Sequence, residues 1–425
     1  MRSRSRHAFR TAALVTAVFA STLTAQATTT AVADVPAPLK TEAVFNNPTG
    51  TAAEQQAIVT RQVELIAGAP AGARIRLAMF YADDPALPNA LIAAHQRGVE
   101  VQAIFDEKAV GMGPYKSLLA ELGGDTAKAS WVMSCGAGRG CVGTRALGTV
   151  DAINHNKFLL LSQTGSTPNV VVQSSANLHV GRDGTKGWNN ALVLTGNDGI
   201  YNAYNGYFDD LKARRANNYY YSTGRPPVAS GNAKAHFYPR AESNGSPYND
   251  PSEDTVATVL DNVKCFGNSQ YGTTDNHRTR IRVSMTIFSR PYLADRLAEL
   301  DAQGCYVEVS ETYNPDSALE KQSLETLLRK TSSVYGGVIT KYYCQADSTW
   351  IHDKYLLVEG NYYNTPDRKV LWTGSHNWSG NSLRQSDETM LQLEDSGVFD
   401  SYVANFNQLR AATTHQPANG APATC

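Results

Sequence analysis

The stretch Ile351–Glu359 reads Ile-His-Asp-Lys-Tyr-Leu-Leu-Val-Glu and decides how the rest of the chain is interpreted. His352 and Lys354 stand two residues apart at the head of an apolar run, which is typical of a strand in a sheet covered on both faces. Side chains two apart on a strand point to the same face, so we expect the imidazole and the ammonium group to project together.

A second copy of this pattern occurs earlier in the chain. The stretch Asn154–Ser162 reads Asn-His-Asn-Lys-Phe-Leu-Leu-Leu-Ser, so His155 and Lys157 repeat the spacing. The chain has 9 histidines, and these two alone are followed by a lysine at the second position. Duplication in the same register argues against two unrelated structural histidines.

The repeat extends through the surrounding segments. Arg74–Met79 and Arg280–Met285 are similar strands, and in both copies a helix follows and a glycine (Gly98 or Gly304) stands 24 positions after the first arginine. Strand–helix–strand order is typical of a parallel sheet. Downstream, each copy has an apolar strand that leads to an asparagine, a further strand and a closing helix.

We therefore predict an α/β protein of two tandem, similar α-β-α halves with mixed, largely parallel sheets and a pseudo-two-fold relation. The halves are expected over residues 34–213 and 234–425. Residues 214–233 are expected to form a connector, because they contain Asn, Pro and Gly without clear periodicity. Such symmetry would bring both His-x-Lys pairs to one site at the junction, a favoured place for ligands.

The residues expected at this junction suit phosphodiester chemistry. Lysine charges and asparagine N–H groups stabilise a tetrahedral oxyanion. A neutral imidazole can attack phosphorus to form a phosphohistidine, and a protonated imidazole can give its proton to the leaving alkoxide. Histidine titrates near neutral pH, as both roles require. The lysines supply positive charge, and the scattered His and Asp form no metal-ligand template, so we predict no metal and no cofactor.

These residues resemble the signature of the phospholipase D superfamily, His-x-Lys-x(4)-Asp followed by a Gly/Ser-x-Asn element, usually in two copies. The second copy has Glu359 in the acidic slot and then Gly374-Ser375-His376-Asn377, whereas the first has Ser162 and then Ser174-Ser175-Ala176-Asn177. The resemblance implies four catalytic residues, His155, His352, Lys157 and Lys354. It also implies substrate phosphate-binding by Asn177, Asn377, Ser175 and Ser375, although the two serines could equally cap turns.

The family often has an acid after the second element that orients each histidine. The second half offers Asp387 and Glu388, and the first half aligns Asn189 and Asn190 with them. An amide stabilises imidazolium less than a carboxylate does. We therefore expect His155 to be the neutral nucleophile, with Asn190 as its supporting residue, and His352 to be the general acid, supported by Asp387 and Glu388. Glu359 is a further supporting residue, although strand alternation puts it and Ser162 on the face opposite the lysine.

The N-terminus is typical of a secretory signal. Arg2, Arg4, Arg6 and Arg10 precede an apolar run, Thr11–Leu23, that is too short to span a bilayer. We expect cleavage near Ala33 and a secreted protein. Cleavage removes four arginines and no acids, which leaves 34 basic against 39 acidic residues and a net charge of −5. That charge is not typical of a polycationic nucleic-acid binder.

All six cysteines follow this segment, and an even number in a secreted chain predicts disulfides. Cys135 and Cys141 flank a short Gly-rich loop and are plausible partners. The other four cysteines could pair in three ways: Cys265, Cys305, Cys344 and Cys425.

The sequence thus favours a secreted, metal-independent phosphodiesterase that acts at a membrane or micelle surface and hydrolyses phospholipid head groups to phosphatidic acid. One alternative is an extracellular endonuclease of the same superfamily, which the acidic charge disfavours. Another is a catalytically decayed phosphate- or lipid-binding module, suggested by Ser162 and by the missing acid in the first half. The internal duplication makes a monomer sufficient.

Overall fold

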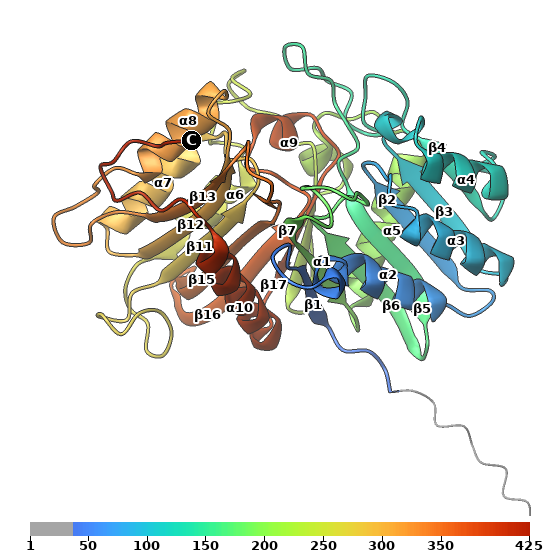
Figure 1. Ribbon diagram of the computed structural model, residues 1–425, viewed down its shortest axis with the longest axis horizontal. Coiled ribbons are helices and arrows are strands. Elements are labelled where there is room, and N and C mark those ends of the chain that lie inside the picture. Colours follow the sequence, from blue (N-terminus) through green and yellow to red (C-terminus); the bar gives the residue numbers. More distant parts are fainter. Residues whose placement is uncertain (1–36) are drawn as a thin grey trace, which may run out of the picture. The chain divides into compact units, whose positions relative to one another are not determined.

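Two mixed β-sheets flanked by helices form the framework of the computed structural model, which describes residues 37–425 (Figure 1). The predicted signal segment over 1–33 lies outside the described residues. Residues Ala37–Cys425 form one compact unit. Within that range, no helix is both long and apolar enough to cross a bilayer.

The elements of the first half alternate strands and helices before a run of strands. In chain order they are β1 (Glu42–Asn46), α1 (Ala52–Gln55), α2 (Ala57–Ala67), β2 (Arg74–Met79), α3 (Ala86–Gln96), β3 (Glu100–Phe105), the 3-10 turn η1 (Glu107–Ala109), α4 (Gly113–Leu122), β4 (Trp131–Ser134), β5 (Lys157–Thr164), β6 (Thr167–Ser174), β7 (Gly187–Leu194) and α5 (Asp198–Lys212). The strand order is β1-β7-β6-β5-β2-β3-β4.

The second half repeats this plan with additions. Its elements are the π-helical turn η2 (Tyr220–Gly224), β8 (Val228–Ser230), β9 (Ala233–Phe237), α6 (Thr255–Asp261), β10 (Val263–Lys264), β11 (Arg280–Met285), α7 (Pro291–Ala302), β12 (Tyr306–Tyr313), α8 (Ala318–Leu327), β13 (Ile339–Cys344), β14 (Trp350–Ile351), β15 (Lys354–Tyr362), β16 (Thr365–Gly374), α9 (Gly380–Arg384), β17 (Thr389–Leu393) and α10 (Ser396–Ala412). The strand order is β13-β12-β11-β15-β16-β17-β9-β8.

The two similar α/β halves and the mixed sheets are confirmed, but the expectation that the sheets are largely parallel is wrong. Parallel pairing is limited to β2-β3-β4 and β11-β12-β13, where a helix lies between successive strands, and to the short pair β14-β7. The other neighbours pair antiparallel, because short turns such as the one between β5 and β6 reverse the chain directly. Residues 214–233, expected to be irregular, include η2 and β8.

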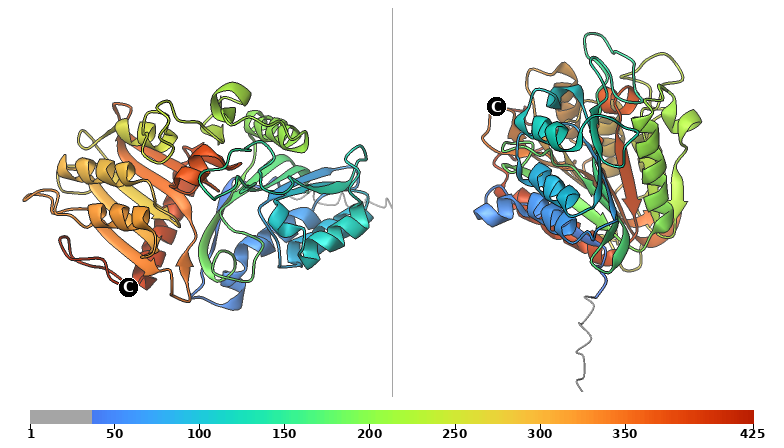
Figure 2. Two further views of the ribbon diagram at one scale, coloured as in Figure 1. Left: turned by 90° about the horizontal axis from the view of Figure 1, so that it is seen from above. Right: turned by 90° about the vertical axis from the view of Figure 1, so that its right-hand side faces the viewer.

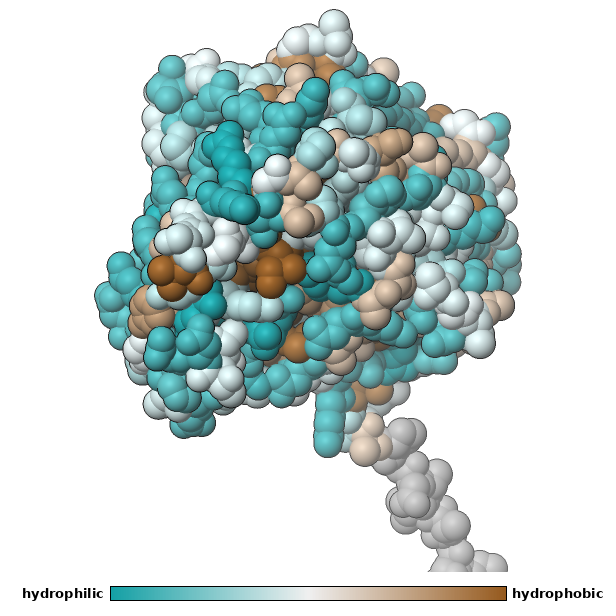
Figure 3. Space-filling model, turned by 60° about the vertical axis from the view of Figure 1, so that its left-hand side comes forward, coloured by the Kyte–Doolittle hydropathy of each residue, from teal (hydrophilic) through white to brown (hydrophobic). Residues whose placement is uncertain are grey.

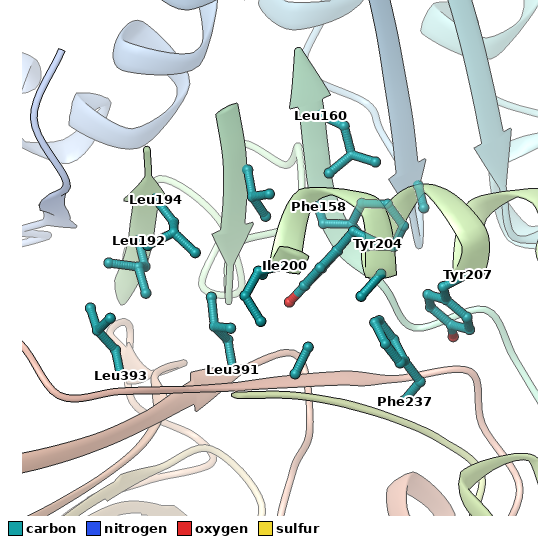
Figure 4. Close-up of a cluster of buried hydrophobic side chains, with 14 of the residues drawn as sticks. Phe158, Leu160, Leu192, Leu194, Ile200, Tyr204, Tyr207, Phe237, Leu391 and Leu393 are labelled. Atoms are coloured by element: carbon teal, nitrogen blue, oxygen red, sulfur yellow. The ribbon is translucent and has the colours of Figure 1, made fainter. Parts of the chain in front are cut away.

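Helices cover the outer face of each sheet, and a shared core fills the space between the sheets (Figures 1 and 2). α2, α3 and α4 pack on the first sheet, and α6 and α7 pack on the second. The central core joins strand residues of both halves with α5 and α10. Figure 4 shows Phe158, Leu192 and Tyr204 of the first half beside Phe237 and Leu391 of the second. This burial fixes the two halves against each other.

Equivalent glycines end the first crossover helix of each half. Gly98 follows α3 with φ +90°, and Gly304 follows α7 with φ +103°, a backbone conformation that side chains disfavour. A Cβ on Gly304 would also lie 2.2 Å from the Phe266 ring. The 24-residue spacing seen in the sequence therefore marks the same turn in both halves.

Three disulfides join all six cysteines of the described chain. They are Cys135–Cys141, as expected from the Gly-rich loop, Cys265–Cys305 and Cys344–Cys425. The last two bonds are one of the three possible pairings of these four cysteines that the sequence left open. The bonds are compatible with an oxidising, extracellular location.

Candidate active site

Each histidine of the His-x-Lys pairs lies immediately before a strand, not within it. β5 and β15 begin at the lysines, so the expectation that both members of each pair are strand residues is wrong. The reason is that the backbone of each histidine bonds to the opposite half. His155 N–H donates to the carbonyl of Asp387 at 3.0 Å, and His352 N–H donates to that of Trp188 at 2.8 Å.

These contacts belong to two matching crossings between the halves. Just before His352, β14 pairs with β7 in the parallel direction, with Ile351 opposite Trp188. Just before His155, Asn154 forms a bridge with Asp387. Each histidine-bearing segment therefore lies against the start of a strand in the other half. The segment before His352 lies against β7, and the segment before His155 lies against the residues just before β17.

The residue that orients each histidine consequently comes from the opposite half. Glu388 Oε1 lies 2.8 Å from His155 Nδ1, and Asn189 Oδ1 lies 2.8 Å from His352 Nδ1. The expectation that Glu388 supports His352 is wrong, because the crossing places this carboxylate at His155. The histidine without an acid is His352.

The structure also shifts the alignment of the halves by one residue. Ser175 N–H donates to the Asn190 carbonyl at 2.9 Å, and Ser375 N–H donates to the Thr389 carbonyl at 3.0 Å, so Asn190 matches Thr389. Asn189 then matches Glu388. The connection from the serine is one residue longer in the first half, 15 positions against 14. The alignment of Asn189 and Asn190 with Asp387 and Glu388 had instead put Asn190, and not Asn189, in the orienting position.

The hydrogen bonds of Asn189 fix the tautomer of His352. Asn189 Nδ2 donates to the Gly184 carbonyl at 2.9 Å, and its Oδ1 accepts from Ser175 Oγ at 2.8 Å. With Oδ1 facing the ring, His352 Nδ1 must be the donor. Glu388 accepts in the same way from His155 Nδ1, so Nε2 of each neutral imidazole keeps its lone pair.

Both imidazoles are neutral in this environment. Burial lowers the pKa of His155 to about 4, although Glu388 acts in the opposite direction. Burial lowers the pKa of His352 well below its ordinary value, and Lys354 and Lys157 lower it further. Burial raises the pKa of Glu388, but the opposing effects of His155, His376 and Lys157 together outweigh it, and the net shift is downward. The carboxylate is therefore ionised.

The two lysines lie at equivalent buried positions. Lys157 Nζ donates to the His155 carbonyl at 2.8 Å, and Lys354 Nζ donates to the His352 carbonyl at the same distance and to Thr286 Oγ1 at 3.0 Å. Burial lowers the pKa of Lys157 to about 8, and burial together with Lys157 lowers that of Lys354 well below its ordinary value. An anion at the site would stabilise the charge of both ammonium groups.

The predicted phosphate-binding asparagines retain unused polar groups. Asn177 and Asn377 are both buried, and the Oδ1 atom of each has no hydrogen-bond partner within residues 37–425. Asn177 Nδ2 donates to Asp183 at 2.9 Å, and Asn377 lines the largest pocket described below. Both remain candidates for contact with substrate.

The two predicted serines fix strands. Ser175 Oγ donates to Asn189 and accepts from Asn190 N–H at 3.0 Å, while Ser375 Oγ accepts from Thr389 N–H at 3.1 Å. Both serines are fully buried. These contacts favour the turn-fixing role over direct phosphate binding, which stays a prediction.

The remaining supporting residues hold the framework. Asp387 accepts three backbone N–H bonds from the loop at 141–143. Asn190 donates to Thr373 Oγ1 at 2.5 Å and to Tyr402 Oη at 2.9 Å, which joins the first sheet to the second half. Glu359 pairs with Arg282 at 2.9 Å, and at the matching register Ser162 Oγ accepts from Arg74 N–H at 2.8 Å. None of these side-chain bonds reaches the imidazole of His155 or His352.

Sequence reasoning missed a polar group on the loop after Asn177. Asp183 accepts from Asn177 and from Tyr81 Oη, and its carboxylate raises the pKa of both lysines of the His-x-Lys pairs against the larger opposing effect of burial. His179 lies between Asp83 and Asp183 and further lowers the pKa of His352. These residues have no partner in the repeat, so the duplication gave no signal for them.

The candidate site opens into a pocket of about 470 Å³. His155, Glu388 and Asn377 are among the residues that line it, and its apolar side chains include Phe80, Val150, Ile153, Ile287 and Leu319. Among the described residues that line this pocket there is no lysine or arginine. The side of the molecule shown in Figure 3 is mostly hydrophilic, with apolar residues in separate patches.

Two clusters within residues 37–425 combine side chains of metal-binding type: Cys135, Cys141 and Asp387, and Cys344, Asp347 and His415. The cysteines of both are in disulfides, so they offer no thiolate. The donor sets do not fit a metal centre.

Comparisons with known proteins agree with this geometry. Residues 64–212 and 274–410, more than half of the chain, match the family described as "Cardiolipin synthase, PLD-like domain". No curated protein matches the chain.

Two solved structures share the fold. Phosphatidylserine synthase from Haemophilus influenzae is 13% identical with a TM-score of 0.55, and the match covers 89% of this chain and 87% of that chain. Polyphosphate kinase from Porphyromonas gingivalis is 13% identical with a TM-score of 0.51, and the match covers 88% of this chain and 54% of that chain. This chain therefore spans about half the length of the kinase. With both His-x-Lys pairs brought to one junction and both repeats matched by the family model, the chain belongs to the phospholipase D superfamily and, within it, to the cardiolipin synthase-type PLD-like family.

Proposed function

We propose that the protein cleaves the phosphodiester bond of phospholipid head groups through a covalent phosphohistidine and releases phosphatidic acid. The observation that carries this proposal is the pairing of two neutral histidines. Each is held through Nδ1 from the opposite half, and each stands beside a buried lysine. Nε2 of each ring is left free for nucleophilic attack or proton transfer.

In the first step His155 acts as the nucleophile. Its Nε2 lone pair forms a bond to phosphorus, and the bond from phosphorus to the leaving alkoxide oxygen breaks. The ring then carries positive charge, which the ionised Glu388 stabilises through Nδ1–H. His352, which becomes protonated when the bound phosphate anion offsets the lysine charges, gives its Nε2 proton to the alkoxide, and the lysines stabilise charge on the phosphate oxygens.

In the second step neutral His352 acts as the base. It takes a proton from water, whose oxygen attacks phosphorus, and the P–N bond breaks with its electron pair returning to His155. The roles are those predicted from the sequence, but the reason differs. The carboxylate supports the nucleophile, and the general acid has an amide partner, Asn189.

The pocket favours a lipid over a nucleic acid. Phe80, Val150, Ile153, Ile287 and Leu319 offer apolar surface to acyl chains, whereas nucleic-acid backbones are bound by clustered lysines and arginines. The cations of the site are the two lysines behind the histidines. A nuclease would need basic surface leading to them, and the lining of the pocket does not supply it.

Phosphatidyl transfer is a second activity of the same site. The matched family and the similar synthase carry names of transfer enzymes. A phosphohistidine reacts with any hydroxyl that reaches it, so an alcohol in place of water gives a new phosphodiester. The proportion of the two products depends on how well the pocket excludes water.

Secretion is part of the proposal. Three disulfides suit an oxidising compartment, and the basic and apolar N-terminal segment is typical of a secretory signal. N-terminal sequencing of protein from the culture medium should start near Asp34, and recovery of the uncleaved chain in the cells alone would contradict it.

The activity is tested with phosphatidylcholine vesicles, ethanol and EDTA, and in parallel with plasmid DNA and EDTA. We expect phosphatidic acid and phosphatidylethanol, and intact plasmid. Nicked plasmid without lipid turnover would instead support the nuclease. No turnover of either substrate would support the binding module.

Variants identify the nucleophile. His155→Ala and His352→Ala should each lower kcat/KM by at least about 10³-fold. Acid hydrolyses the P–N bond of a phosphohistidine. The reaction is therefore quenched at alkaline pH, and the modified residue is identified by mass spectrometry. The phosphoryl group should lie on His155; label on His352 would reverse the two roles. His277→Asn, an exposed residue with φ 50°, is the matched control and should retain full activity.

A further inference from the structure

A second pocket of about 400 Å³ lies on the second half and shares no lining residue with the catalytic pocket. We call it the β9 pocket. Lys234 and His236 of β9 and Gln392 of β17 form its floor, and the walls come from α6, η2 and the β15–β16 hairpin. The wall residues are Thr255, Thr258, Val259, Tyr221, Tyr362, Tyr363 and Arg368, with Arg240 beside them.

The floor is polar where strand alternation would allow an apolar surface. Ala235 and Phe237 of β9 face the central core, so Lys234 and His236 point to the opposite face of the sheet. Lys234 pairs in register with Gln392. The side chains on this face therefore meet α6 with charged and amide groups, and the space between them is the pocket.

The pocket is lined by cationic groups without an acidic residue among its lining. Arg240 pairs with Glu253 at 2.5 Å and lies over the Tyr221 ring, and Arg368 pairs with Glu394 and lies over the Tyr362 ring. These contacts fix both guanidinium groups before any ligand arrives.

Lys234 differs from the two arginines. It forms no ion pair with any residue in the range 37–425, although it is half-buried in the floor of the pocket. Its charge is therefore not neutralised locally, and the β9 pocket carries a net positive charge.

His236 supplies a second, independent indication of a ligand. It is 4% exposed, and its Nδ1 lies 3.1 Å from Tyr221 Oη, but Nε2 has no hydrogen-bond partner among the described residues. When Tyr221 donates to Nδ1, Nε2 carries the proton, and a buried N–H without an acceptor is costly. Burial, with Lys234 and Arg240, lowers the pKa of His236 to about 3, so the ring is a neutral donor.

We propose that the β9 pocket binds the phosphate of a small phosphate monoester. Lys234, Arg240 and Arg368 surround the phosphate oxygens, and His236 Nε2–H donates to one of them. The hydroxyls of Thr255 and Thr258 and the tyrosine rings contact the organic part, which the volume of the pocket accommodates. A free metabolite and the head group of a membrane lipid such as phosphatidic acid present the same chemistry.

The full-length mature protein is titrated with glycerol 3-phosphate by calorimetry, and its flotation with phosphatidylcholine vesicles is measured with and without phosphatidic acid. Binding to the soluble monoester without a phosphatidic acid-dependent flotation identifies a free ligand. Flotation that depends on both phosphatidic acid and Lys234 identifies the lipid head group.

Lys234→Ala should weaken this binding by about tenfold or more, as expected for the loss of a charge-assisted contact. Lys234→Arg should retain it within a few-fold, which separates loss of charge from misfolding. Lys264→Ala removes an exposed lysine of β10 that does not line the pocket and should have no effect. Turnover of a soluble phosphodiester should be unchanged in all three. Wild-type binding by Lys234→Ala in both assays would overturn the proposal.

Discussion

Glu388 and Asn189 occupy equivalent positions on opposite halves, and their different charges distinguish the two histidines. In the proposed mechanism, the carboxylate beside His155 stabilises the cation that forms when its ring bonds to phosphorus. An amide beside His352 does not stabilise imidazolium in this way. Because the pKa of His352 is low, the proposed mechanism requires that a bound phosphate anion offset the lysine charges before this histidine is protonated.

Asn189→Asp should extend activity to higher pH. The general acid works when protonated, so kcat/KM falls as pH rises through the pKa of His352. A carboxylate at position 189 raises that pKa, and we expect the alkaline limb of the pH–rate profile to move up by about one pH unit or more. Asn189→Ala is the control: it removes the hydrogen bond and should lower the rate without this upward shift. An unmoved alkaline limb in Asn189→Asp would show that another group gives the proton.

The buried carboxyl group of Glu311 should make the stability of the folded protein depend on pH. It is 2% exposed, its Oε1 has no hydrogen-bond partner within residues 37–425, and burial together with Glu320 raises its pKa well above the ordinary value. The folded state therefore holds this proton at pH values where the unfolded state has lost it. Its contribution to stability is fully present below the unfolded pKa and is lost as pH rises towards the folded pKa.

Glu311→Gln keeps the shape of the side chain and removes the ionisation. Its melting temperature relative to wild type should therefore increase between pH 5 and pH 9, as measured by thermal denaturation at each pH. Glu308→Gln on the same strand is the comparison. Glu308 lies 3.5 Å from Arg282 and 3.6 Å from Arg410, so its loss should destabilise the protein at neutral pH. A constant difference for Glu311→Gln across this pH range would contradict the assignment.

At the residue scale the sequence predicted the histidines and lysines but not their partners. The spacing of His-x-Lys is local and was visible twice. The pairing of His155 with Glu388 spans 233 positions and depends on which half each segment lies against. An alignment of the copies displaced by one residue was enough to assign Asn190 in place of Asn189.

At the scale of elements, β14 and the bridge at Asn154 hold the two histidines in place. Both are short, and neither shows a periodic signal in the sequence. Periodicity did predict β2, β3, β11, β12 and the helices between them to within a few residues. It could not predict the antiparallel additions β1, β8 and β9, because their positions depend on the edges that the repeated strands leave unpaired.

A disulfide joins the C-terminal tail to the edge strand β13 and so closes a long loop of the chain. Cys425 bonds Cys344 at the end of β13, and Thr424 N–H donates to Tyr342 Oη at 3.0 Å. The two cysteines are 81 positions apart, so the bond restricts a large loop of the unfolded chain. The entropic cost of that loop corresponds to about 4 kcal/mol.

The double variant Cys344→Ser/Cys425→Ser should therefore lose about 2–4 kcal/mol of unfolding free energy in denaturant titrations. Activity below the transition should be retained, because neither cysteine lines the catalytic pocket. Thr424→Ala, which leaves the backbone bond to Tyr342 in place, should change stability by less than about 0.5 kcal/mol. Equal stability of the double variant and wild type would show that packing alone fixes the tail.

At the scale of the whole molecule, the central core makes the halves a single folding unit. Phe158 and Leu192 of the first half pack in the same cluster as Phe237 and Leu391 of the second (Figure 4). The crossings at the histidines then add backbone bonds between the halves. Separation of the halves would expose the core and dismantle both histidine sites at once.

Leu391→Ala should destabilise both halves together. The side chain is fully buried between the sheets, and such truncations cost about 2–5 kcal/mol. We expect one cooperative transition, displaced to lower denaturant concentration, in both tryptophan fluorescence and circular dichroism. Leu119→Ala on α4, where the side chain is 41% exposed, should shift the midpoint very little. A second transition that Leu391→Ala leaves unmoved would show that the halves fold independently.

The exchange of orienting residues between the halves has a consequence for the direction of the reaction. If each half were a separate, identical copy, the assembled dimer would give both histidines the same partner, and substrate could bind in either of two opposed orientations with equal reactivity. Fusion of the copies into one chain lets positions 189 and 388 diverge. The amide and the carboxylate then make the two sides of the site chemically different. Under the proposed mechanism, the phosphatidyl group therefore bonds on the His155 side and the leaving alcohol departs on the His352 side.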